Sequence, residues 1–362
     1  MKIAYLTSVH PRNDTRVDKM CQTSLKFSEV FLICADGFGN SKKKNFTIYD
    51  LGVPKNRLSR VWTVCNQIYK TARNINADIY HIHDPELIRI GLNLIKDGKK
   101  VIFDSHEYII PQLLDKVYLN FLIKYLIVIF YFFYQSIALN KFTALIAATK
   151  RISKDLKKFN SNVTVIFNYP TINKNFSSKP VVSQKKKICY IGDISTNRGI
   201  VNLVKSLEFV KNDITLELAG KFDSKELLVR LKKIPSWKKV NYLGYVDHNV
   251  FFNSTNYQAG MLNLLRTRNH NESLPNKLFE YMKYGIPIIY SNFYFWNRII
   301  KKNNCGVPCN QNNPQDIANK IDYIINNPIK AKKMSMNGFK AFKKYYNWCS
   351  EEKKLFKLYK KI

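Results

Sequence analysis

Strand-like apolar runs alternate with helical patterns along almost the whole chain, and this alternation constrains the fold more than any other feature. Helical segments between successive apolar runs are typical of parallel strands joined by crossover helices. The sequence therefore predicts an α/β protein with two doubly wound parallel sheets. The runs of the first sheet are Ile3–Thr7, Val30–Cys34, Ile79–His83, Val101–Asp104, Ala144–Ala148 and Val163–Phe167. Those of the second are Ile188–Ile191, Ile214–Ala219, Val240–Leu243, Gln258–Leu264 and Ile286–Tyr290.

A length of 362 residues suits two domains that each bury a core. The segment Asn173–Lys187 is polar, rich in lysine and without periodicity, so it reads as a linker. We expect a first domain over residues 1–172, a linker over 173–187 and a second domain over 188–340. Residues 341–362 should form a C-terminal helix that packs back toward the first domain. Ligands of such sheets bind beyond the carboxyl ends of the strands, and a cleft between two domains is the natural active site.

The segment Asn271–Ser291, NESLPNKLFEYMKYGIPIIYS, predicts a loop, a helix and a buried strand. Pro275 suits the first turn of the helix, and Gly285 suits its C-terminal cap. An exposed helix N-terminus favours phosphate, and a carboxylate farther along favours ribose hydroxyls. An ordinary amphipathic helix with a solvated polar face is the alternative. On the helical wheel the apolar side carries Leu278, Phe279, Tyr281 and Met282, and the polar side carries Asn276, Lys277, Glu280 and Lys283.

The spacing of Glu272 and Glu280, Glu-x7-Glu, resembles the signature of the family 4 retaining glycosyltransferases of the GT-B fold. The string PNKLFEYM-x-x-G-x-P is most similar to the bacterial surface-polysaccharide branch, which makes O-antigen, lipopolysaccharide or capsule. The resemblance implies two Rossmann-like domains that face each other across a cleft. It also implies transfer of a sugar, of hexosyl type, from a nucleotide-diphosphate sugar to a lipid-linked saccharide, with retention of anomeric configuration.

The segment Ile188–Ile200, ICYIGDISTNRGI, resembles the first donor-domain loop of that family. Gly192 lets the backbone approach a ligand, and Arg198 offers a planar fork to phosphate oxygens. Asp193 stands where the family carries its first basic residue, and the alternatives that could compensate are Lys277, Lys221 after Gly220 or a different conformation of the loop. The resemblance implies no metal, because basic side chains and helix N-termini offset the charge of the leaving diphosphate. The donor-binding residues that it implies are Gly192, Arg198, Gly199, Tyr245, Ser273, Asn276, Lys277 and Glu280.

Polar residues also follow the predicted strands of the first half, at Ser8–Lys19, His81–Leu87 and Asp104–Tyr108. The string DSHEY resembles the family segment whose histidine contacts the transferred sugar, so His106 and Glu272 are the implied catalytic residues. The loop that normally faces the acceptor carries His10, Asp14 and Arg16, which we expect to bind the acceptor. A zinc site from His81, His83, Asp84 and His106 is the alternative. It lacks support because no cysteine or paired-helix spacing accompanies the two alternating histidines.

Lysine and arginine number 59 against 26 acidic residues, a formal charge of +33. This excess predicts an anionic partner, unless it reflects a genome that favours lysine codons. A nucleic-acid-binding protein is one alternative, but the basic residues are scattered and no binding motif is present. A nucleotide-sugar epimerase of the same architecture is another, although a basic and locally apolar chain suits a membrane-bound acceptor better. We therefore expect no nucleic acid partner.

The segment Tyr118–Leu139 contains the uninterrupted apolar run YLIVIFYFFY. Lys124 and Asn120 interrupt the length that a spanning helix needs, and the βα pattern resumes directly afterwards. The alternatives are a core helix and a helix whose aromatic side lies in an anionic membrane interface, and the surplus of lysine favours the membrane. The start at Met1–Ser8 reads as a strand rather than a signal peptide, and seven scattered cysteines suit a reducing compartment. We expect a cytoplasmic protein on the cytoplasmic face of the membrane, and the sequence leaves its oligomeric state open.

Overall fold

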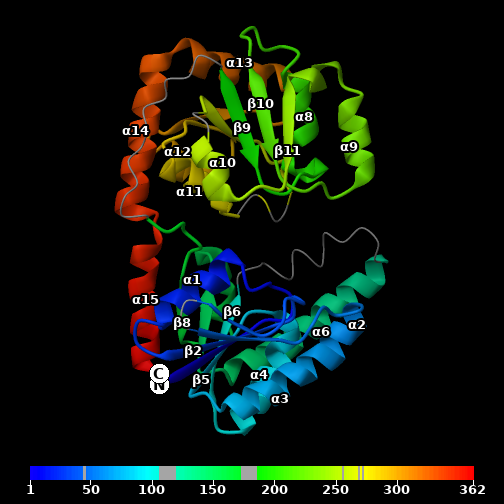
Figure 1. The fold of residues 1–362 in the computed structure, drawn as a ribbon, viewed down its shortest axis with the longest axis vertical. Helices are drawn as coiled ribbons and strands as arrows, with labels where there is room; N and C mark the ends of the chain where they lie inside the picture. The colour runs from blue at the N-terminus through cyan, green and yellow to red at the C-terminus, as the bar shows by residue number, and fades with distance from the viewer. Residues whose placement is uncertain (44–45, 106–119, 173–185, 255–256, 268–269, 271–272) are drawn as a thin grey trace. The chain divides into compact units, whose positions relative to one another are not determined.

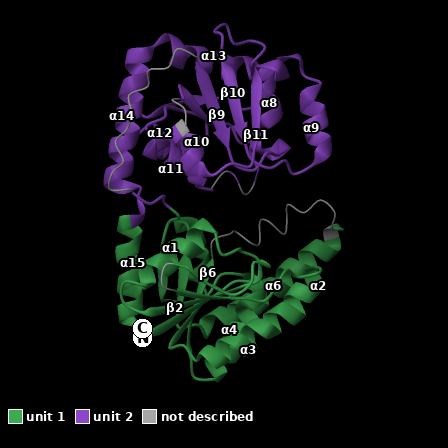
Figure 2. Cartoon of the chain, in the orientation of Figure 1, with its two compact units in different colours: residues 1–168, 349–362 green, residues 169–348 purple. Residues whose placement is uncertain are grey.

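The computed structural model describes the chain except for residues 44–45, 106–119, 173–185, 255–256, 268–269 and 271–272. Its internal contacts divide the chain into two compact units, residues 1–168 with 349–362 and residues 169–348 (Figure 2). The sequence placed the first boundary at residue 172 and the start of the returning C-terminal segment at residue 341. The expected linker lies outside the described residues as far as residue 185.

The first unit contains an eight-stranded sheet in which all neighbours are parallel except β3 and β4. Its strands are β1 Lys2–Leu6, β2 Glu29–Cys34, β3 Ser41–Lys43, β4 Phe46–Asp50, β5 Ile79–Ile82, β6 Lys100–Ser105, β7 Ala144–Ala147 and β8 Val163–Val165, in the spatial order β3-β4-β2-β1-β5-β6-β7-β8. Its helices are α1 Thr15–Ser24, α2 Arg57–Ser59, η1 Arg60–Val64, α3 Cys65–Ile75, η2 Pro85–Leu87, α4 Ile88–Lys96, α6 Phe121–Asn140, α7 Lys150–Leu156 and, from Cys349 onward, α15 Trp348–Lys361.

The second unit contains a six-stranded sheet in which every pair is parallel. Its strands are β9 Lys187–Ile191, β10 Thr215–Ala219, β11 Val240–Gly244, β12 Ala259–Leu262, β13 Ile288–Ser291 and β14 Gly306–Cys309, in the order β11-β10-β9-β12-β13-β14. Its helices are η3 Thr196–Arg198, α8 Ile200–Ser206, α9 Lys225–Lys232, η4 Pro235–Lys239, α10 His248–Ser254, α11 Asn276–Lys283, α12 Tyr294–Ile300, α13 Pro314–Asn326 and α14 Pro328–Tyr345.

Helices cover both faces of each sheet, as Figure 1 shows for each unit separately. In the first unit, side chains of α3 and α4 share a core with the strands on one face. On the other face the Tyr5 hydroxyl contacts the Met20 carbonyl of α1 at 3.1 Å and the Tyr359 hydroxyl of α15 at 2.8 Å. In the second unit α8 packs on α13, and α11 packs on α14. The predicted fold class, α/β with two parallel sheets, is confirmed.

Three short strands were not predicted, namely β3, β4 and β14. The strand β14 reads GVPC and contains Pro308, which cannot donate a hydrogen bond to a ladder. The structure places β14 at the edge of the second sheet, where it pairs with β13 alone. An edge position tolerates proline, so the order of strands explains the exception.

Helix α6 answers the question that the apolar run YLIVIFYFFY left open. Residues Leu122–Asn140 have the length and composition to cross a membrane, and only 17% of this window is buried. The outward stripe consists of Leu122, Leu126, Phe130, Phe133 and Ile137, which are 61–74% exposed. The buried contacts of α6 gather near its end, at Gln135, Ala138 and Leu139. The helix is therefore a surface element of the described chain and not the core helix that was the alternative.

Candidate active site

Lys277 lies one residue inside α11 and is 7% exposed. Its Nζ lies 3.6 Å from the centre of the Tyr190 ring at the end of β9. A Cβ added at Gly192 would be 3.3 Å from the same Nζ, so the ammonium reaches the loop that follows β9. Within the described part of the chain Nζ makes no hydrogen bond. Burial, and after it the charge of Arg198, lowers the pKa of Lys277 well below its usual value.

The helix around Lys277 agrees with the sequence prediction in part. Gly285 has a φ of 61°, as its predicted role at the helix end requires. Pro275 immediately precedes α11 as its N-cap residue rather than opening the first turn. The polar side of the helix is not the fully solvated face of the alternative interpretation, because Lys277 and Lys283 are both buried. Asn276, a predicted donor-binding residue, is exposed at the first position of the helix.

The loop between β9 and α8 is closely packed and has two glycines with positive φ, Gly192 at 117° and Gly199 at 72°. A Cβ at Gly199 would lie 2.0 Å from the Asn263 carbonyl oxygen, so no larger residue fits there without movement. Arg198 ends the turn η3, and its Nη2 lies 3.8 Å from Oδ2 of Asp193, whose side chain is 80% exposed. Asp193, which stands where the resembling family carries a basic residue, thus pairs loosely with Arg198, the predicted phosphate-binding residue.

Glu280 lies on α11 three residues after Lys277, and its Oε1 accepts a hydrogen bond from Nδ1 of His248 at 2.8 Å. The other carboxylate oxygen, Oε2, is buried and has no partner among the described residues. The contact with Glu280 raises the pKa of His248 above its ordinary value, and burial opposes that rise. Sequence reasoning missed His248, although it lies two residues after the segment Leu243–Val246, which contains the predicted donor-binding residue Tyr245. Tyr245 of that segment is 86% exposed.

One further predicted residue of this half, Ser273, lies near the start of α11. The Ser273 hydroxyl donates to the His270 carbonyl at 3.2 Å, and the Ser273 carbonyl accepts from the Trp296 indole at 2.8 Å. Ser273 therefore anchors the loop before α11 to α12. The predicted catalytic residues Glu272 and His106 lie outside the described residues.

In the first unit, Arg16 is buried in a bidentate ion pair with Asp104 of β6. Its Nε and Nη2 donate to the two carboxylate oxygens at 2.7 Å each, and its Nη1 donates to the Ile166 carbonyl at 2.9 Å. Burial would raise the pKa of Asp104, but the Arg16 charge and His83 hold it well below its usual value. Arg16 was expected to bind the acceptor, and its guanidinium instead joins α1 to the ends of two strands.

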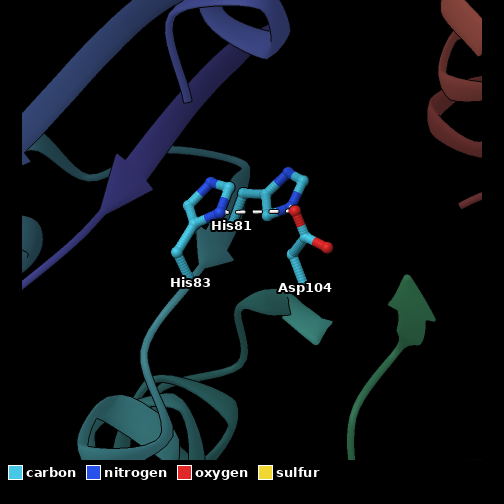
Figure 3. Close-up of side chains that lie close together, drawn as sticks. All are labelled: His81, His83 and Asp104. Carbon is cyan, nitrogen blue, oxygen red and sulfur yellow. Dashed lines mark ion pairs between the residues drawn. The ribbon is translucent and has the colours of Figure 1, made fainter. Parts of the chain in front are cut away.

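His81 and His83 lie beside the same carboxylate, with their rings stacked at 4.7 Å (Figure 3). The Asp104 Oδ2 lies 3.3 Å from His83 Nδ1 and 3.9 Å from His81 Nε2. These three residues, and separately Cys34, Asp36 and Asp50, are grouped closely enough to hold a metal ion. The guanidinium of Arg16 already binds both oxygens of Asp104, so a metal there would meet a fixed positive charge at short range. We therefore assign His81, His83 and Asp104 to the surroundings of the ion pair with Arg16 rather than to a metal site.

His10 and Asp14, the other predicted acceptor residues, form a second polar group with Asp84. His10 Nε2 lies 3.2 Å from Asp84 Oδ1, and His10 Nδ1 lies 3.5 Å from Asp14 Oδ2. Burial lowers the pKa of His10, but the two carboxylates outweigh it and raise the pKa to about 10. Burial raises the pKa of Asp84, but His10 and backbone N–H donors bring it to about 2. The structure therefore brings His10 and Asp14 together and places Arg16 in the separate pair with Asp104.

Comparisons with known proteins find similarity to glycosyltransferases. Residues 171–341 match the family described as Glycosyl transferases group 1. A curated Haemophilus influenzae protein, described as an uncharacterized glycosyltransferase, is 24% identical over 194 residues, 52% of either chain. The chain thus matches about half the length of that relative.

Solved structures are similar over the whole chain. Sucrose-phosphate synthase from Thermosynechococcus elongatus has a TM-score of 0.77 at 13% identity, covering 100% of this chain and 98% of that one. Anabaena HepE in complex with UDP and glucose has a TM-score of 0.76 at 12% identity, with both chains covered completely. WaaG, a glycosyltransferase involved in lipopolysaccharide biosynthesis, has a TM-score of 0.72 at 12% identity, covering 98% and 99%. The chain therefore has the GT-B glycosyltransferase fold, and its residues 171–341 match the model of the family Glycosyl transferases group 1.

Proposed function

We propose that the chain is a retaining glycosyltransferase that moves a sugar from a nucleotide-diphosphate sugar to a lipid-linked saccharide during synthesis of a bacterial surface polysaccharide. The group 1 domain supports the transferase activity. The similar structures of HepE with UDP and glucose and with UDP-glucose support the donor class. The likeness to WaaG supports the polysaccharide role. Neither an epimerase nor a nucleic-acid-binding protein is favoured by these matches.

One observation carries the proposal: α11 presents two buried charged groups with unused hydrogen-bonding atoms. Lys277 Nζ and Glu280 Oε2 have no partner within the described residues. Burying such groups unpaired is costly, so their presence indicates a ligand that supplies an anion beside hydroxyl groups. A nucleotide diphosphate has both. Lys277 and Arg198 bind its phosphates beside Gly192, and Glu280 accepts hydrogen bonds from the ribose.

In the proposed reaction the sugar C1–O bond to the leaving diphosphate breaks while the acceptor oxygen bonds to C1 on the same face. The acceptor's proton passes to an oxygen of the leaving diphosphate. Lys277 and Arg198 stabilise the charge that grows on that group, and His106 and Glu272 hold the sugar. Because these cations serve the phosphates, we propose catalysis without a metal. Unchanged activity in EDTA would support this step, and activity that returns only with an added divalent cation would contradict it.

Calorimetry tests the donor assignment by comparing the affinities of the protein for ADP, GDP and UDP with its affinities for their 2′-deoxy counterparts. We expect at least one ribonucleotide to bind more tightly than its deoxy form. The Glu280→Ala variant should weaken binding of that ribonucleotide by about 1.5–3 kcal/mol, the range for hydrogen bonds to charged groups. It should leave the deoxy form less affected. If the ribonucleotide preference survives in the variant, Glu280 does not bind ribose.

For the acceptor side we propose that α6 lies in the interface of an anionic membrane. Its outward stripe, the five residues from Leu122 to Ile137 named above, is apolar along the whole helix. The strands β6 and β7, before and after α6, are neighbours in one sheet, so a helix that crossed the membrane would place the two strands on opposite sides of it. A helix that lies along the surface fits that connection better than one that crosses.

The neighbouring segment supplies matching charge. The Phe132 ring of α6 contacts Phe159 at 5.4 Å, and the Asn160 side chain donates to the Leu139 carbonyl at 2.9 Å. These contacts place the basic stretch before Phe159 beside the apolar helix. Its exposed cations are Lys150, Arg151, Lys154, Lys157 and Lys158. Cations beside an interfacial apolar stripe favour anionic lipid headgroups.

Sedimentation with vesicles of phosphatidylglycerol and phosphatidylcholine tests the membrane proposal. We expect binding that falls as salt rises and as phosphatidylglycerol is removed. Phe130→Glu with Phe133→Glu should abolish binding while nucleotide affinity and circular dichroism stay unchanged. Lys154→Glu with Lys157→Glu should weaken it, whereas Lys332→Glu with Lys333→Glu, in the other unit, should have less effect. If the protein does not sediment with the vesicles, or if it self-associates through this stripe, the proposal is contradicted.

A further inference from the structure

Among the described residues, His248 is the hydrogen-bond partner of the Glu280 carboxylate. It opens the short helix α10, which follows β11 and the exposed Tyr245. The ring is about half exposed, and Glu280 is mostly covered. No part of the proposed function uses this histidine, and the sequence did not single it out.

The remaining contacts between α10 and α11 fix where the His248 ring can lie. Phe252 stacks on Tyr284 at 4.4 Å, and the Tyr284 hydroxyl donates to Asn249 Oδ1 at 3.0 Å. The Asp247 carboxylate accepts from the N–H groups of Asn249 and Val250, which fixes the start of α10. Because both helices are held by contacts other than the ion pair, His248 is held in place to meet Glu280.

We propose that His248 is a positioning residue of the donor site, which holds the Glu280 carboxylate in the orientation that receives the ribose hydroxyls. This inference rests on the proposed function. A glutamate side chain has several rotamers, and fixing one of them before the ligand arrives removes an entropic cost of binding. With Oε1 held by His248, the carboxylate retains acceptor sites, since its two oxygens accept about four hydrogen bonds.

The charged groups around His248 are consistent with this role. Glu280 faces it from α11, Asp247 precedes it, and Lys277 lies three residues before Glu280 on α11. The two carboxylates favour the protonated ring and Lys277 disfavours it, and the sum raises the pKa of His248. A protonated ring donates a charge-assisted hydrogen bond to the Glu280 carboxylate, whose remaining acceptor sites can receive ribose hydroxyls.

The test compares the ribonucleotide that binds most tightly among ADP, GDP and UDP with its 2′-deoxy form. His248→Ala should raise the dissociation constant of the ribonucleotide about three- to tenfold, the cost of one freed side chain. The deoxy form should change less. His248→Gln retains an N–H donor and should restore most of the ribose preference. In turnover assays the donor KM should rise while kcat stays nearly constant.

Two variants separate positioning from a general loosening of the helices. Asn249→Ala removes the hydrogen bond between α10 and Tyr284, the residue that follows α11, and should leave the ribose preference intact. In a Glu280→Ala background, His248→Ala should have no further effect, since the pair acts as one unit. Equal weakening of both nucleotides, equal loss in Asn249→Ala, or additive losses would overturn the inference.

The same measurements tell which claim has failed. If Glu280→Ala retains the ribose preference, the proposed donor site is wrong, and His248 has no ribose to serve. If Glu280→Ala loses the preference and His248→Ala retains it, only the role of His248 is rejected.

Discussion

The Lys277 Nζ lies over the face of Tyr190 at 3.6 Å from the ring centre, and within the described chain it has no hydrogen-bond acceptor. The ring face offers partial compensation for a buried ammonium, but not the hydrogen bonds it loses on leaving water. Tyr190 is the last residue but one of β9, and its hydroxyl donates to the Asp193 carbonyl at 2.7 Å, so the ring is itself fixed. The Lys277 ammonium is thus positioned beside the turn that follows β9.

Replacing Lys277 by Met should separate ligand binding from stability. Met has a similar shape without the charge, so the free energy of unfolding should stay constant or rise. Affinity for the nucleotide diphosphate should fall by about 1.5–3 kcal/mol, the range for hydrogen bonds to a charged group. The free nucleoside, which has no phosphates, should bind as before. Calorimetry and urea unfolding measure the two quantities.

Lys283→Met is the matched control, since Lys283 is on the same helix, also buried, and near the Tyr284 ring at 5.0 Å. We expect it to leave diphosphate affinity unchanged. An equal loss in both variants would mean that the charge of the whole helix, rather than one ammonium, attracts the ligand.

Nucleotide binding should also take up a proton. Burial and Arg198 lower the pKa of Lys277 in the free protein, and a bound diphosphate would raise it again. Between those two pKa values the ligand binds the protonated amine, so affinity should fall as pH rises through this window. Calorimetry in buffers of different ionisation enthalpy counts the protons. The uptake should be smaller in Lys277→Met, and equal uptake in both proteins would place the titrating group elsewhere.

The sequence predicted both sheets because apolar runs of strand length recur regularly, and the Gly285 turn because glycine marks helix ends. It could not predict that Lys277 is buried. A helical wheel assigns a residue to the polar side of its own helix, whereas the cover comes from Tyr190, far away in the chain. His248 was missed for the same reason, since its contact with Glu280 spans 32 positions. Local sequence patterns predict individual helices and strands, whereas the site is formed by contacts between elements that are distant in the chain.

Arg198 should matter more for turnover than for binding, because charge on the leaving diphosphate grows in the transition state. Arg198→Ala should lower kcat by at least about tenfold, with a smaller change in donor KM. Arg198→Lys should recover only part of the rate, since lysine lacks the planar fork. Asp193→Asn serves as the control: it removes the loose pairing at 3.8 Å and should not lower kcat. Full activity in Arg198→Ala would move the phosphate site away from this loop.

The Arg16–Asp104 pair should contribute to stability more than any exposed ion pair of the first unit. Asp104→Asn leaves the Arg16 guanidinium buried without its counter-charge, and such losses cost about 3–5 kcal/mol. Arg73→Met, which breaks an exposed pair with Asp97 at 3.6 Å, should cost less than about 1 kcal/mol. Urea unfolding of the three proteins measures the difference. A small effect of Asp104→Asn would mean that His81, His83 or a ligand stabilises the guanidinium side of this cluster. In that case Arg16, which the sequence assigned to acceptor binding, would again be the residue to test against acceptor affinity.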